Sequence, residues 1–145
     1  MRVEGSTQAL AAGVAGAVAL TTIHQVAQRF VPAAPRMDVV GIRALKRGFG
    51  AAEVPPSERP NLFATALAGD IVFNSAYYSF ATTWTRGLAL GLAAGAGALM
   101  LPQRLGLGEP PQSDRLSNQV MTVSWYVAGG LAAACTAKWL RATRR

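Results

Sequence analysis

The chain has 145 residues, of which 51% are hydrophobic and 14% are charged, whereas about 25% of the residues of a typical soluble domain are charged. Its mean hydropathy is +0.25, and its 15 glycines suit helices that pack closely in lipid. This composition excludes an ordinary soluble domain and predicts an integral membrane protein. The length suffices for a single membrane domain over residues 1–145 and leaves no room for a sizeable soluble catalytic domain.

The charge of the chain is strongly basic, with 14 Lys and Arg against 7 Asp and Glu and a net charge of +7. In a soluble protein this excess would suggest a nucleic-acid partner. Here the basic residues gather in the hydrophilic connections and the tail, where they can meet anionic headgroups at roughly 1 kcal/mol each. We therefore expect the lipid bilayer as a partner and no nucleic acid.

Four apolar stretches are long enough to be considered as membrane spans, because one crossing takes about 20 residues. They cover about residues 9–31, 62–81, 84–101 and 120–140. The second and third cannot form one helix, since 40 residues would extend about 60 Å, twice the hydrocarbon thickness. The polar run from Thr82 to Arg86 is predicted to separate them, and Pro102 to close the third span. The predicted fold is therefore an all-α bundle of four transmembrane helices.

The first span has a competing interpretation as a cleaved signal peptide. Arg2 precedes it, and Ala17-Val18-Ala19 has the form of a cleavage site. Its apolar part is rich in Ala and Gly rather than Leu, however, and the apolar pattern continues past this site to Val31. A retained helix is the preferred interpretation.

The connection between the first two spans is predicted to hold a short amphipathic helix over about residues 36–47. Pro32 and Pro35 end the first span before it, and Gly48 and Gly50 are expected to end it. Its apolar face comprises Met37, Val40, Gly41, Ala44 and Leu45. Its basic face comprises Arg36, Arg43, Lys46 and Arg47. Such a helix is typical of one that lies on the membrane surface, and a solvated loop helix without lipid contact is the alternative.

Small residues recur at helical spacing on three of the spans. The third carries Gly87, Gly91 and Gly95, the first carries Gly13 between Ala9 and Ala17, and the fourth carries Gly129 followed by Ala133 and Ala137. A face without bulky side chains lets a neighbouring helix approach closely. We expect this close packing within one bundle, and in addition a homo-oligomer or a larger membrane complex.

Polar residues form a second pattern inside the spans. Thr21, His24 and Gln28 continue the small-residue face of the first span, and Asp70, Asn74 and Tyr77 share one face of the second. Tyr126 of the fourth span is expected in the same half of the bilayer. Antiparallel neighbours would place His24 and Asp70 about 10 and 12 Å from the same surface. This match predicts a buried pair, while hydrogen-bonded packing residues are the alternative.

The sequence carries no recognisable catalytic signature. It contains no phosphate-binding loop, no H-E-x-x-H, no G-x-S-x-G and no paired carboxylates in one span. The single cysteine, Cys135, and the single histidine form no cluster at metal-ligand spacing, so we expect neither a metal nor a cofactor. The leading hypothesis is a non-enzymatic interaction or assembly component, multi-pass in a bacterial inner membrane. A small transporter or channel that uses the His24 and Asp70 cluster is the alternative.

Overall fold

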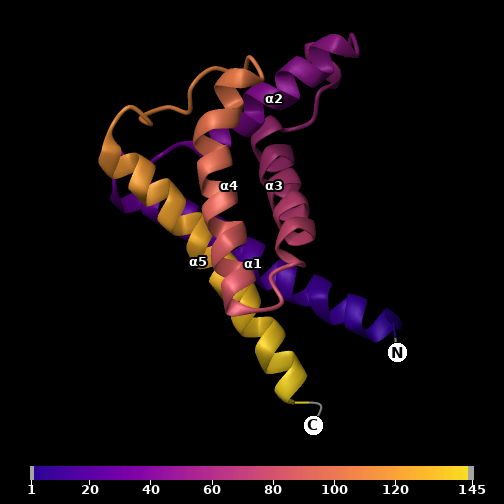
Figure 1. Cartoon of the computed structure of the whole chain (residues 1–145). Helices are drawn as coiled ribbons and strands as arrows, with labels where there is room; N and C mark the ends of the chain where they lie inside the picture. The colour runs from indigo at the N-terminus through magenta and orange to yellow at the C-terminus, as the bar shows by residue number, and fades with distance from the viewer. Residues whose placement is uncertain (1, 144–145) are drawn as a thin grey trace.

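The computed structural model describes residues 2–143, and in that part it is entirely helical. The helices are α1 (Arg2–Phe30), α2 (Met37–Ala51), the 3-10 turn η1 (Pro56–Glu58), α3 (Leu62–Tyr78), α4 (Trp84–Arg104) and α5 (Leu116–Ala142). Figure 1 shows both termini at one end of the molecule, the terminal end, and α2 at the other, the loop end.

Three helices, α1, α4 and α5, are long and apolar enough to cross a membrane. This agrees with the membrane class predicted from composition. The fourth predicted span is not confirmed, because α3 ends at Tyr78 instead of residue 81 and has only 17 residues. Its length of about 26 Å falls short of the roughly 30 Å of hydrocarbon. The chain leaves α3 through a turn in which the amide of Ala81 donates to the carbonyl of Tyr78.

The predicted break between α3 and α4 is confirmed. The Thr83 side chain caps α4 by accepting a hydrogen bond from the amide of Arg86. Asn61 caps α3 in the same way, accepting from the amides of Phe63 and Ala64. Both side chains satisfy amides that a helix start leaves without a partner.

Two predicted helix ends are wrong. Pro102 lies inside α4, which continues to Arg104, and α2 continues through Gly48 and Gly50 to Ala51. Each helix ends where the backbone turns left-handed, at Gly106 (φ +71°) and at Glu53 (φ 55°). At both ends an amide reaches back five residues to a free carbonyl, Leu107 to Pro102 and Val54 to Phe49, which is the bonding of a Schellman motif.

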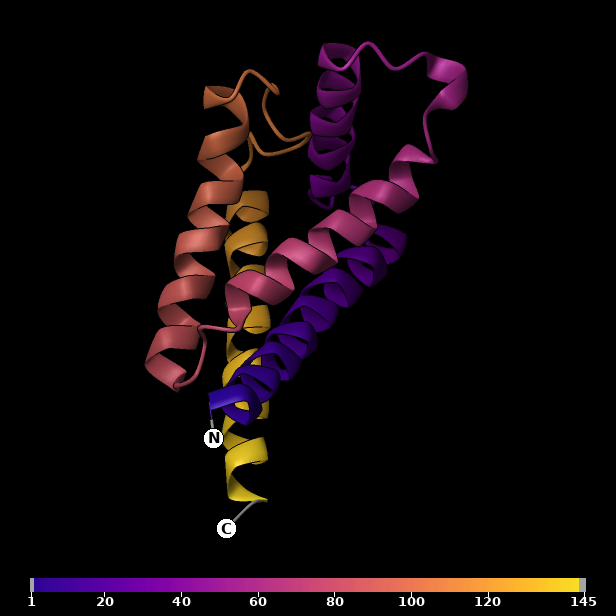
Figure 2. The same cartoon turned by 90° about the vertical axis from the view of Figure 1, so that its right-hand side faces the viewer.

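The long helices pack in the order α3, α1, α5, α4, which forms an open arc and not a closed bundle. The extensive contacts are those of α4 with α5, of α5 with α1 and of α1 with α3, while α2 packs on α3. Figure 2 shows α3 and α4 close to each other where the chain joins them and apart toward the loop end. The two ends of the arc therefore face each other across a space.

The five glycines predicted to mediate packing all lie at helix contacts within the chain. A Cβ at Gly91 would stand 2.5 Å from the Cα of Val127, and one at Gly95 would stand 2.7 Å from the Cα of Val123. The same holds for Gly87 against the backbone of α5, for Gly13 against that of α3 and for Gly129 against that of α1. The small-residue faces thus bring backbones together inside one molecule, and the predicted oligomer stays a prediction.

The core of the arc lies where α1, α3 and α5 meet. Tyr78 is fully buried among Leu20, Ala81, Tyr126 and Ala133. Its hydroxyl donates a 2.7 Å hydrogen bond to the backbone carbonyl of Tyr126. This cluster fills the space between α1, α5 and the C-terminal end of α3.

Candidate functional site

A cavity of about 910 Å³ occupies the space between α3 and α4. Its wall on α1 extends from Thr21 to Gln28, on α3 from Thr65 to Tyr77, and on α4 from Ala93 onward. On α1 and α4 these are the halves nearest the loop end, whereas on α3 the wall extends along nearly the whole helix. At its narrow end the two sides are joined by a 3.0 Å hydrogen bond from the hydroxyl of Tyr77 to the carbonyl of Leu90.

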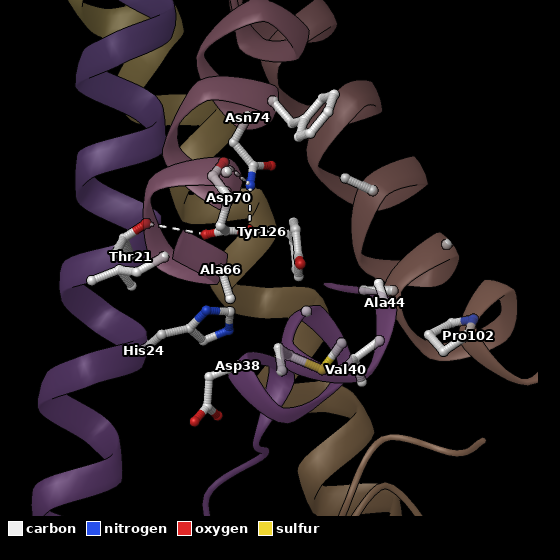
Figure 3. Close-up of a pocket in the computed structure, with 18 of the residues that line it drawn as sticks. Thr21, His24, Asp38, Val40, Ala44, Ala66, Asp70, Asn74, Pro102 and Tyr126 are labelled. Carbon is white, nitrogen blue, oxygen red and sulfur yellow. Dashed lines mark hydrogen bonds between the residues drawn. The ribbon is translucent and has the colours of Figure 1, made fainter. Parts of the chain in front are cut away.

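Helix α2 covers the cavity at the loop end. The residues of its predicted apolar face, Met37, Val40, Gly41, Ala44 and Leu45, all line the cavity, as Figure 3 shows for Val40 and Ala44. A Cβ added at Gly41 would stand 3.3 Å from the Cβ of Ala66 on α3. These residues are turned toward the cavity, where Met37, Val40, Gly41 and Leu45 are partly buried and Ala44 is exposed. A position of α2 on the membrane surface stays a prediction.

The basic face of α2 binds the connection between α4 and α5. Arg43 donates to the carbonyls of Leu107 (3.2 Å) and Glu109 (2.8 Å), and Arg47 donates to the carbonyl of Leu105 (2.7 Å). Lys46 is exposed. Two of the four residues expected at the membrane surface thus hold α2 across the opening, because loop carbonyls are acceptors that a guanidinium can reach.

The fourth basic residue, Arg36, forms a two-pronged ion pair with Asp38, with N–O distances of 3.0 and 2.8 Å. Gln28 of α1 also donates to Asp38, at 3.1 Å. Burial of Asp38 opposes its ionisation, but the hydrogen bond and charge of Arg36, with the Gln28 amide, hold the pKa of Asp38 below its usual value. Asp38 is therefore an ionised carboxylate at the mouth of the cavity, and Arg36 balances its negative charge.

The deeper polar end of the cavity is built around Asp70. Its carboxylate accepts a 3.2 Å hydrogen bond from the hydroxyl of Thr21 and a 2.8 Å bond from the amide of Asn74. Asn74 also donates to the backbone carbonyl of Asp70 at 2.9 Å. Thr21 belongs to α1, so one side-chain bond ties α1 to α3 at this depth (Figure 3).

His24 lies in the same cavity but does not bind Asp70. Among the residues that the structure describes, the ion pair is that of Arg36 with Asp38. The imidazole is only 6% exposed, its ring meets those of Trp125 (4.7 Å) and Tyr126 (5.9 Å) edge-on, and its Nε2 has no hydrogen-bond partner. The predicted direct pair is wrong, because Thr21, one turn earlier on α1, reaches the carboxylate while His24 packs against α5.

The remaining predicted members of the polar cluster lie at the cavity wall. Asn74, Tyr77 and Tyr126 all line it. Tyr78, which the sequence did not single out, belongs to the core. Its spacing from Asp70 and Asn74, eight and four residues, places it on the same inward face of α3.

We expect Thr21 and Asp70 to be energetically coupled and His24 and Asp70 to be independent. In double-mutant cycles on thermal unfolding in detergent, Thr21→Val and Asp70→Leu should deviate from additivity by about 0.5–1.5 kcal/mol. His24→Leu with Asp70→Leu should be additive within about 0.5 kcal/mol. A larger coupling for the histidine pair than for the threonine pair would contradict the geometry described above.

The site offers hydrogen bonding and charge inside an apolar enclosure. The described residues include no group of three or more His, Cys, Asp or Glu side chains that could hold a metal ion. The function has to be argued from the cavity itself, since comparison with known proteins found no matching family model, curated protein or solved structure.

Proposed function

We propose that the protein is a membrane-embedded binding protein that takes a small, mostly apolar molecule into the cavity between α3 and α4. The observation that carries this proposal is the cavity itself. Its volume of about 910 Å³ lies within the roughly 300–1,000 Å³ of small-molecule sites. Its wall is largely apolar, and its polar groups include Asp70, which Thr21 and Asn74 hold by hydrogen bonds, as expected of a site that orients one ligand.

A small molecule fits this space better than a helix of a partner protein. A helix about 10 Å wide that crosses about 30 Å occupies roughly 2,400 Å³, more than twice the cavity. The glycine faces that motivated an assembly role are also occupied by contacts within the chain. Association with a second copy or with a larger complex therefore remains a prediction from the sequence.

Binding is also favoured over conduction. The cavity wall includes no residue of α1 before Thr21 and no residue of α4 before Ala93. Beyond it, Tyr78 and its neighbours fill the space between α1, α3 and α5. Passage to the terminal end would require this core to open, whereas binding requires no such change.

In the membrane we propose four crossings, with α3 as the fourth and α2 at the surface of the loop end. The outer face of α3 supports this placement, because Val72, which does not line the cavity, is 65% exposed and would be costly in water. A shortfall of a few ångströms can be met by local thinning of the bilayer. A bacterial inner membrane remains the proposed location.

Filling the cavity should abolish binding. A Cβ at Gly97 would meet only the flexible side chain of Leu101, at 3.4 Å, so we expect Gly97→Leu to fold and to occupy the site. Native mass spectrometry of the detergent-purified protein with added dodecanol should show one bound molecule per chain, and Gly97→Leu should lose it.

Ala96→Leu is the matched control, since Ala96 is exposed on the same helix and does not line the cavity. It should retain the bound molecule. Equal retention by both variants would overturn the proposed function.

A further inference from the structure

We infer that the ligand of this cavity carries a positively charged nitrogen on an apolar tail, with Asp70 as its counter-ion. The inference rests on the proposed function and specifies the ligand class. It follows from the charges that line the cavity, from the hydrogen bonds that Asp70 lacks, and from the unpartnered nitrogen of His24.

The charge of the cavity is opposite to that of the chain. The protein carries a net charge of +7, yet the residues that line the cavity include two carboxylates, Asp38 and Asp70, and no lysine or arginine. Arg36 neutralises Asp38 from outside the lining. Among the described residues Asp70 has no cationic partner, so its carboxylate, once ionised, is the uncompensated charge of the site.

Asp70 is held ready to accept a further donor. Its two oxygens receive one hydrogen bond each, from the neutral groups of Thr21 and Asn74. An ionised carboxylate has about four acceptor positions, so each oxygen retains capacity. Asp70 is partly buried, and an ionised carboxylate away from bulk water without a counter-charge is costly. An ammonium group placed beside it lowers that cost.

His24 supplies an independent observation. Its side chain is more than nine-tenths buried, and its Nε2 is enclosed without a partner, although buried polar atoms are normally hydrogen-bonded. Figure 3 shows the ring directed into the cavity between Asp70 and Asp38. With its proton on Nδ1, the imidazole presents Nε2 as an acceptor, and an ammonium group carries further N–H donors of the kind that this nitrogen lacks.

The other residues of the cavity wall also favour a cation with an apolar tail. Tyr126 lines the cavity beside His24, and its ring attracts a cation through the electron density of its face. Leu67, Phe73 and Leu101 offer apolar contacts for a tail. A carboxylate ligand would meet the like charge of Asp70, and an uncharged alcohol would leave that charge uncompensated.

The test compares three amphiphiles that share one tail: dodecylammonium, dodecanol and dodecanoate. Each is titrated by calorimetry into the full chain in nanodiscs of zwitterionic lipid, with protein-free nanodiscs as the blank. We expect dodecylammonium to bind roughly 10- to 100-fold more tightly than the other two, the range of a hydrogen bond to a charged group. Asp70→Asn, which keeps an acceptor for Thr21, should abolish this preference.

Asp114→Asn is the matched control, because Asp114 is an exposed carboxylate in the connection between α4 and α5; it should leave the preference unchanged. His24→Phe is a second variant should Asp70→Asn not fold, since it keeps an aromatic ring against Trp125 and removes Nε2; it should weaken dodecylammonium more than dodecanol.

The outcomes separate the two proposals. Equal binding of all three amphiphiles, lost in Gly97→Leu, would overturn the cationic ligand and leave the binding function standing. Binding that Gly97→Leu does not change would overturn both.

Discussion

Tyr78→Ala is expected to lower the free energy of unfolding by about 3–5 kcal/mol, the range for removing a large buried aromatic side chain. Tyr78 is 0% exposed and packs beside the crossing of α1 and α5, since a Cβ at Gly16 would stand 3.3 Å and one at Gly129 would stand 3.1 Å from its ring. Its removal leaves a void that tightly packed backbones cannot close. Thermal unfolding in detergent, followed by circular dichroism, measures the loss.

Two further variants separate what the hydroxyl and the buried ring of Tyr78 each contribute to the free energy of unfolding. Tyr78→Phe removes only the hydrogen bond to the carbonyl of Tyr126 and should cost about 0.5–1.5 kcal/mol. Phe80→Ala changes an aromatic residue that is 68% exposed and should stay within about 0.5 kcal/mol. Similar losses for Tyr78→Ala and Phe80→Ala would show that the described core is incorrect.

Gly91→Ala is expected to lower the free energy of unfolding by about 1–3 kcal/mol, although it adds one methyl group. The new Cβ would lie 2.5 Å from the Cα and 3.0 Å from the amide nitrogen of Val127. Backbone atoms cannot rotate away as a side chain can, so α4 must move off α5. Because their contact is extensive, that movement weakens packing along the whole crossing.

Gly97→Ala is the control on the same helix, where the added methyl would meet only the side chain of Leu101. Alanine is the better helix former, so this variant should be neutral or more stable by up to about 1 kcal/mol. Thermal unfolding in one detergent compares the two. If Gly91→Ala were as stable as Gly97→Ala, α4 and α5 would not be in the described contact.

Local sequence was sufficient to predict the class of the fold and the composition of each helix face. Apolar length predicted α1, α4 and α5 as spans, and the polar run at Thr82 to Arg86 predicted the break before α4. The spacing of Asp70 and Asn74 placed them on one face, and both line the cavity. These features depend on helical periodicity and on hydrophobicity, which are properties of a single segment.

The tertiary structure decided which surface each face meets. The apolar face of α2 covers a cavity although it would suit lipid equally well, because the hydrophobic effect requires removal from water and does not specify the apolar partner. Arg43 and Arg47 bind loop carbonyls more than fifty residues away in sequence. His24 and Asp70 lie at similar depths and line one cavity. The rotation of α1 about its axis, however, places Thr21 and not His24 within hydrogen-bond distance of the carboxylate. Depth follows from counting residues along one helix, whereas rotation follows from the packing of α1 against both α3 and α5, and that information is not contained in any single segment.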